Sequence, residues 1–104
     1  MPAKNSLAAK PSGSKTYNVN WDFQLGNSAA QALRRIPKGD LERINTALNA
    51  MRNDPLAGDV IPLKGRYAGS FRRRVGSWRI IFALNDQRKM IEVQDILRRT
   101  STTY

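Results

Sequence analysis

A β-hairpin between Ser70 and Leu84 is the feature that most limits how this chain can fold. The stretch "SFRRRVGSWRIIFAL" contains two segments that suit β-strands, and Gly76-Ser77 separates them as a tight turn. A second turn follows at Asn85-Asp86. Three consecutive strands are therefore expected, at 70–75, 78–84 and 90–96. Side chains alternate between the two faces of each strand, so this sheet has one apolar face and one basic face.

Two helices are expected before this sheet. Asn27 or Ser28 can cap the first helix, which ends before Pro37. The second helix, with Asp40 as its cap, continues to Asn53-Asp54-Pro55. Its apolar residues recur at spacings of three and four and form one stripe: Leu41, Ile44, Leu48 and Met51. This pattern fits a helical hairpin with one apolar side.

The segment before the helices also alternates. In "KTYNVNWDF", Tyr17, Val19 and Trp21 share one side, which predicts a half-buried strand. We therefore expect an α+β domain, with an N-terminal strand, a two-helix hairpin and a mostly antiparallel three-stranded sheet. The helices cover one face of this sheet and leave the other open. Residues 1–15, rich in Pro, Gly, Ser, Ala and Lys, are expected to form a flexible arm, so that 16–104 make a single domain.

Positive charge is concentrated in the second half of the chain. The 104 residues carry a formal charge of +10, and residues 60–104 contain ten basic and three acidic side chains. Residues 16–59 are balanced, with five side chains of each sign. A basic surface of this kind suits a polyanion, with nucleic acid first and an acidic protein second. The alternative is a solubilising surface, although such surfaces usually mix both signs.

Three arginines are expected to converge on the face that the helices leave open. Alternation places Arg72 and Arg74 on one side of their strand, and Arg79 joins them from the next strand. Neighbouring strands lie about 4.8 Å apart, so the three guanidinium groups can share one patch. Planar, permanently charged guanidinium groups suit phosphate.

Arg73 is the exception, because alternation points it toward the helices. Its side chain can extend to the edge of the sheet or pair with a carboxylate such as Asp54 or Asp59. A structural role is favoured for it.

The chain contains no cysteine and no histidine. It therefore has no thiolate metal site, no disulfide and no histidine to act as general base or metal ligand. No cofactor and no metal site are expected. No apolar run approaches the roughly 20 residues of a membrane span, and a soluble cytoplasmic protein is the expectation.

Residues 17–104 resemble the RelE/ParE superfamily of bacterial toxins from type II toxin–antitoxin systems. Four elements carry the resemblance: Asp54-Pro55 after the second helix, Leu63-Lys64-Gly65 before the sheet, the hairpin "FRRRVGSWRIIF" and the ending "ILRRTSTTY". The ending is similar to that of a RelE-like subgroup. The resemblance implies the same α+β fold that the residue pattern predicts.

RelE-like toxins cut messenger RNA, usually while it occupies the ribosomal A site. By this resemblance, the catalytic side chains belong to Arg72, Arg74, Arg79, either Arg98 or Arg99, and Tyr104. The resemblance also places RNA contacts at the rim of the cleft, from Lys64 and Arg66. Arg73 is a further candidate for an RNA contact.

The chemistry open to such a site is attack by the 2′-hydroxyl of the RNA on the adjacent phosphate. Fixed cations can stabilise the charge that develops: Arg79 on the phosphate oxygens with Arg72 or Arg74 beside it, and the late arginine near the leaving oxygen. The arginines do not supply a general base, because arginine holds its proton too tightly to accept another. Tyr104 is the candidate, since neighbouring guanidinium charge would lower its pKa from the usual value of about 10.

The sequence is also compatible with two other functions. A ParE-like gyrase poison would share the fold and act by binding a protein, although such chains generally lack the full set of basic residues and tyrosine. A non-catalytic module that binds nucleic acid is the third possibility. The positive surface and the resemblance both predict a further partner, an acidic antitoxin that covers the toxin and suppresses it.

Overall fold

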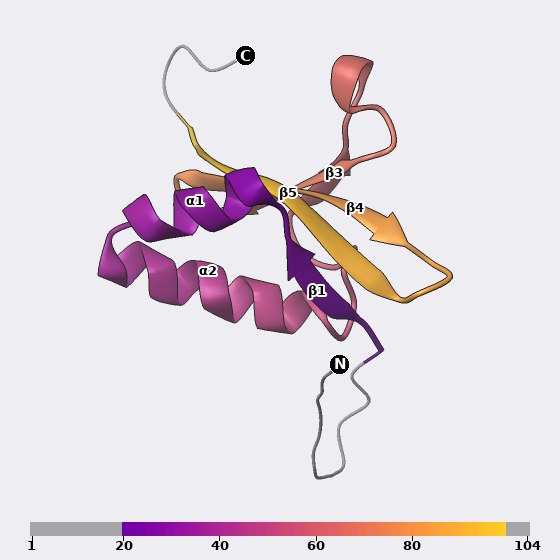
Figure 1. Ribbon diagram of the computed structural model, residues 1–104, viewed down its shortest axis with the longest axis horizontal. Coiled ribbons are helices and arrows are strands. Elements are labelled where there is room, and N and C mark those ends of the chain that lie inside the picture. Colours follow the sequence, from indigo (N-terminus) through magenta and orange to yellow (C-terminus); the bar gives the residue numbers. More distant parts are fainter. Residues whose placement is uncertain (1–19, 100–104) are drawn as a thin grey trace, which may run out of the picture.

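The computed structural model describes residues 20–99 of the chain (Figure 1). Two α-helices, one short 3₁₀ turn and five strands follow in the order β1 Asp22–Leu25, α1 Asn27–Arg35, α2 Lys38–Met51, β2 Val60–Pro62, η1 Gly65–Tyr67, β3 Phe71–Val75, β4 Trp78–Asn85 and β5 Met90–Arg98. The predicted α+β class is confirmed. The predicted arm, the strand residues Tyr17 and Val19, and Tyr104 lie outside the described residues.

All five strands form one sheet in the order β1-β5-β4-β3-β2. β1 runs parallel to β5, and every other neighbouring pair is antiparallel. The three-stranded sheet predicted from the sequence is therefore β3, β4 and β5, with one strand added on each side. The N-terminal strand begins at Asp22, later than predicted, and Trp21 packs partly buried against the core.

The helices lie together on one side of the sheet (Figure 1). The predicted stripe of α2 faces inward, since Ile44, Leu48 and Met51 are at most 1% exposed. From the sheet, the core receives Ile80, Phe82, Ile91, Val93 and Ile96. Burying these side chains removes apolar surface from water, which is the main driving force for the fold. Among the described residues, no helix has the length and hydropathy needed to cross a membrane.

The helix starts differ from the prediction. α1 begins at Asn27 after Gly26, and no side chain caps it. α2 begins at Lys38, two residues before its predicted cap Asp40. The Asp40 carboxylate instead accepts a hydrogen bond of 3.1 Å from the indole N–H of Trp78 on β4. Asp40 therefore joins α2 to the sheet.

β2 is an edge strand with few free backbone donors. The Asp59 carbonyl accepts a hydrogen bond from the Arg74 N–H, and the Leu63 N–H donates to the Ser70 carbonyl. Because backbone groups alternate in direction along a strand, the backbone groups that face the open edge are those of Val60 and Pro62. The Val60 N–H already donates to Gly58, and proline has no N–H. These features limit pairing of this edge with another strand.

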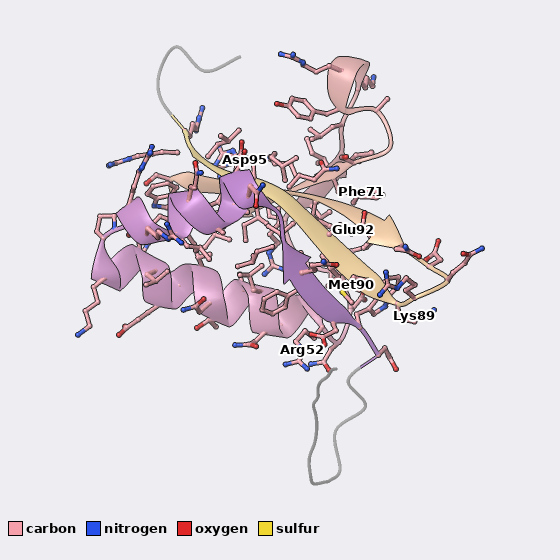
Figure 2. The ribbon with its side chains drawn as sticks, viewed as in Figure 1. Arg52, Phe71, Lys89, Met90, Glu92 and Asp95 are labelled. Atoms are coloured by element: carbon pink, nitrogen blue, oxygen red, sulfur yellow. The ribbon has the colours of Figure 1, made fainter. Side chains whose placement is uncertain are left out.

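The opposite edge of the sheet, at β1, is bonded to the C-terminal end of α2. The Trp21 N–H donates to the Arg52 carbonyl at 2.9 Å, and Arg52 Nε lies 3.8 Å from the Asp22 carboxylate. Lys89 Nζ lies 5.0 Å from the centre of the Trp21 ring. Figure 2 shows Arg52 and Lys89 at this end, far along β4 and β5 from the Gly76 turn.

Candidate nucleic-acid interface

The strand register separates the arginines of the hairpin onto two faces. Residues paired across antiparallel strands point to the same side, and Phe71 pairs with Phe82 on the helix-covered face. Arg72 pairs with Ile81 and Arg74 pairs with Arg79, one position out of phase with the core residues. Arg72, Arg74 and Arg79 therefore share the outer face, which we define as the side of the sheet away from α1 and α2. This is the placement that strand alternation predicts.

Arg79 is an enclosed positive charge on this face. It is only 4% exposed, and its Nη1 donates to the Trp78 carbonyl at 3.2 Å and to the Gly76 carbonyl at 3.5 Å. Ion pairs within residues 20–99 join Arg52 to Asp22 and Arg72 to Asp59, so no described carboxylate balances Arg79. Removing an uncompensated charge from water costs free energy, which an anionic ligand would offset.

Arg72 and Arg74 are both linked to Asp59, in different ways. Arg72 Nη2 lies 3.3 Å from the Asp59 carboxylate, and the Arg72 side chain is 15% exposed. The Arg74 backbone N–H donates to the Asp59 carbonyl at 3.0 Å, whereas the Arg74 residue is exposed. Within the described residues 20–99, Arg74 has no ion-pair partner and presents its cation beside Arg79, whereas the charge of Arg72 is already partly neutralised.

Arg73 lies on the helix-covered side, apart from the other two arginines of β3. The sequence left two alternatives open for Arg73, extension to the sheet edge or an ion pair with Asp54 or Asp59. Among residues 20–99 the ion pair is not formed, because Arg73 Nη1 donates to the Ala57 carbonyl at 3.2 Å and Asp59 pairs with Arg72. Its guanidinium packs on Gly58, where a Cβ would stand 3.1 Å from Arg73 Cζ and φ is +85°. Glycine is needed there for both reasons. Arg73 therefore supports the loop before β2 and does not join the outer face.

The register also distinguishes the two late arginines. Arg98 pairs with Trp78 on the helix-covered side, and its Cζ lies 5.8 Å from the centre of the Trp78 ring. The next residue, Arg99, continues the alternation onto the outer face, and its N–H donates to the Ser77 carbonyl at 2.6 Å. Of the two residues that the sequence left open, Arg99 is the one that shares a face with Arg79. We call Arg72, Arg74, Arg79 and Arg99 the arginine cluster.

Two acidic side chains of β5 also share the face of the arginines, which the sequence did not predict. Glu92 pairs with Ala83 and Asp95 pairs with Ile81, so both belong to the outer face. Figure 2 labels both residues along β5. Strict alternation would turn Asp95 inward with Ile91 and Val93, but the register shifts between Ile81 and Phe82. This bulge returns Asp95 to the arginine side. The break in apolar spacing after Val93, where Ile96 follows at three residues, is the sequence signal that indicates it.

The predicted RNA contacts Lys64 and Arg66 lie on the loop between β2 and β3. Both are exposed. Lys64 directly precedes η1 and Arg66 lies within it, and Figure 1 shows this turn beyond the end of β3 and away from the helices. Arg66 Cζ lies 5.9 Å from the centre of the Tyr67 ring. These two cations are not part of the arginine cluster, but they lie on the loop that leads directly into β3, which carries Arg72 and Arg74.

Solved structures with the same arrangement come from toxin–antitoxin pairs. An archaeal RelE–RelB complex from Pyrococcus horikoshii matches with a TM-score of 0.69 and 24% identity, over 80% of this chain and 99% of that one. The RelBE2 toxin–antitoxin complex of Mycobacterium tuberculosis matches with a TM-score of 0.71 and 21% identity, over 78% and 100%. The chain has the RelE-like toxin fold.

Other structures with this RelE-like fold extend the comparison. A YoeB/ParE toxin from Agrobacterium tumefaciens matches with a TM-score of 0.67 and 22% identity, over 76% of this chain and 99% of that one. No protein-family model and no curated protein sequence matches the chain. At these identities the similarity shows the fold, and the function is argued from the residues of the outer face.

Proposed function

We propose that this protein is the toxin of a toxin–antitoxin pair and inhibits translation by cleaving messenger RNA, most effectively on the ribosome. The observation that carries the proposal is Arg79, a guanidinium that is 4% exposed, lacks a carboxylate among residues 20–99 and shares its face with three further arginines. A site with this excess of fixed positive charge suits a phosphodiester. The RelE-like fold supports the same substrate by analogy.

The proposed reaction needs no group beyond the RNA and the protein. The ribose 2′-oxygen bonds to the adjacent phosphorus, and the bond from phosphorus to the 5′-oxygen breaks. Arg79 and Arg74 stabilise the phosphate oxygens, Arg72 supports them, and Arg99 stands near the leaving oxygen. The 2′-hydroxyl loses its proton to a base, and the 5′-oxygen gains one from water. The products are a 2′,3′-cyclic phosphate and a 5′-hydroxyl end.

Two groups are candidates for the base. Tyr104 remains the candidate from the sequence, and it lies outside the described residues. Asp95 is a second candidate, because it carries a carboxylate on the outer face and stands on β5 beside β4. The variants Asp95→Asn and Tyr104→Phe separate them, since only the variant that removes the base should lose cleavage.

We also propose an acidic antitoxin as the partner of this protein, the cytoplasm as its location and residues 16–104 as its toxin domain. An acidic antitoxin that neutralises the basic surface would suppress toxicity, and RelE–RelB and YoeB–YefM pairs of this fold have been solved as complexes. A toxin that cleaves messenger RNA would act in the cytoplasm. Residues 16–104 make the toxin domain, with residues 1–15 as an arm.

The decisive variant is Arg79→Ala. We expect wild-type protein to give discrete cuts in messenger RNA in a bacterial translation extract, with fewer cuts when ribosomes are removed. Loss of one fixed cation of this kind typically lowers the rate about 10²–10³-fold, so Arg79→Ala should lose growth inhibition and cleavage. Arg88→Ala is the matched control, because it removes an exposed arginine in the turn between β4 and β5.

Full cleavage by Arg79→Ala, with its circular dichroism spectrum unchanged, would show that the site is elsewhere. A wild-type protein that leaves messenger RNA intact and traps broken DNA with gyrase would instead support the ParE-like alternative. A protein that binds RNA without cutting it or inhibiting growth would be the non-catalytic module.

A further inference from the structure

Tyr67 is an exposed aromatic side chain on the loop between β2 and β3. It is 41% exposed, whereas every other aromatic residue within 20–99 belongs to the core cluster or packs against it. Ile61, on β2, is a second large apolar residue near this loop that stays in solvent, at 46%. An exposed aromatic ring next to basic residues is a feature of surfaces that bind single-stranded nucleic acid.

The backbone around Tyr67 is held in a defined turn. The Tyr67 carbonyl accepts from the Ser70 N–H at 2.9 Å, and the Leu63 N–H donates to the Ser70 carbonyl at 2.9 Å. Gly65 and Gly69 take φ values of +65° and +93°, which only glycine adopts easily. The loop therefore presents the ring from a fixed backbone, which lowers the conformational entropy that a ligand would have to remove.

The groups around the ring match the two parts of a nucleotide. Arg66 Cζ lies 5.9 Å from the ring centre, and Lys64 is exposed on the same loop. No acidic residue occurs between Val60 and Asn85, so nothing in this stretch opposes a phosphate. The ring offers a stacking surface for a base, and the two cations offer contacts to the backbone that joins it to the next nucleotide.

The loop that carries Tyr67 joins β2 to β3, beside the outer-face residues Ile61 and Arg72. Arg72 is two residues from Ser70, about 7 Å along the strand, and Ile61 stands opposite Arg72 on the same face. A single strand bound through its phosphate at the arginine cluster can therefore pass Arg72 and Ile61 toward the loop. A nucleotide further along the strand, and not the one that reacts, would reach Tyr67.

We propose that Tyr67, flanked by Arg66 and Lys64, forms a flanking subsite that stacks one nucleobase of the bound single-stranded RNA. This inference rests on the proposed function, because it assumes RNA as the substrate. Stacking on a tyrosine accepts any base, so the subsite contributes affinity and register along the strand more than sequence choice.

The test compares two oligomers of equal charge bound to the full-length protein. One is a fluorescein-labelled ten-nucleotide 2′-O-methyl oligoadenylate, which cannot be cleaved because its nucleophile is blocked. The other has the same backbone without bases. Wild type should bind the base-containing oligomer more tightly. Tyr67→Ala should reduce that preference about fivefold or more and leave affinity for the abasic oligomer unchanged. Tyr67→Trp should restore the preference.

Three results would count against the subsite. Equal loss of affinity for both oligomers in Tyr67→Ala would show a structural role for the ring. Unchanged affinity for both would assign the exposed ring to a different surface, such as a protein interface. Failure of wild type to bind either oligomer would overturn the proposed function itself, and the subsite with it.

Discussion

Asp59 contacts two arginines of the cluster through two different groups. Its carboxylate lies 3.3 Å from Arg72 Nη2, and its backbone carbonyl accepts from the Arg74 N–H. The carboxylate is 53% exposed, so the pair with Arg72 adds little stability, in the range of about 0–1 kcal/mol. Its main effect is on charge, since it neutralises one of the cations that would otherwise face a phosphate.

We therefore expect Asp59→Asn to strengthen RNA binding. An attraction of about 1 kcal/mol between Arg72 and Asp59 that becomes available to phosphate would raise affinity for the uncleavable oligomer about fivefold. The gain should shrink as salt is added, because it is electrostatic. Fluorescence anisotropy at two salt concentrations measures both effects.

Asp86→Asn is the matched control for this prediction. It makes the same change in net charge in the turn between β4 and β5, at the end of β4 far from the arginine cluster. Affinity that rises equally in both variants would mean that overall charge, and not the freeing of Arg72, controls binding.

At the scale of elements, a side-chain hydrogen bond joins α2 to the start of β4. Asp40 of α2 accepts from the Trp78 indole at 3.1 Å, and Trp78 begins the strand that carries Arg79. A hydrogen bond to a charged acceptor typically contributes about 1.5–3 kcal/mol. This contact explains why an acidic residue lies on the side of α2 that meets the sheet.

Asp40→Ala should lower the free energy of unfolding by about 1–2 kcal/mol, because the partly buried indole N–H would lose its acceptor. Urea denaturation followed by circular dichroism measures this. Glu42→Ala serves as the comparison, since Glu42 is exposed on the same helix and should change stability by less than about 0.5 kcal/mol. Equal losses in the two variants would contradict the role given to Asp40.

The bulge in β5 shows why part of the site could not be predicted from the sequence. Alternation along a regular strand is a local property, and it correctly placed Arg72, Arg74 and Arg79 on one face. The register shift opposite Ile81 and Phe82 reverses the alternation of everything after it. Asp95 and Arg99 face outward for this reason, and Arg98 does not.

At the scale of the whole molecule, the described residues already contain a closed core. The buried cluster extends from Ala29 to Ile96, and the partly buried residues around it begin at Trp21. Residues 1–15 carry three lysines and no acid. We propose that this segment contributes charge more than folding free energy.

Deletion of residues 1–15 should accordingly leave the melting temperature and the cleavage of messenger RNA unchanged. Calorimetry and the translation extract measure these two properties on the same preparations. A large fall in cleavage at an unchanged melting temperature would show that the arm takes part in function. A fall in both would show that the domain begins earlier than residue 16.

The sequence by itself determined the features that depend on neighbours in the chain. Turn residues and alternation define the hairpin, spacing defines the stripe of α2, and the absence of histidine limits the chemistry. Only the tertiary structure decided the features that depend on a neighbouring strand: the short strand β2, the pairing of Asp59 with Arg72, and the outward position of Arg99. Backbone pairing between distant segments determines these, and a three-residue strand or one inserted residue leaves little trace in composition or periodicity.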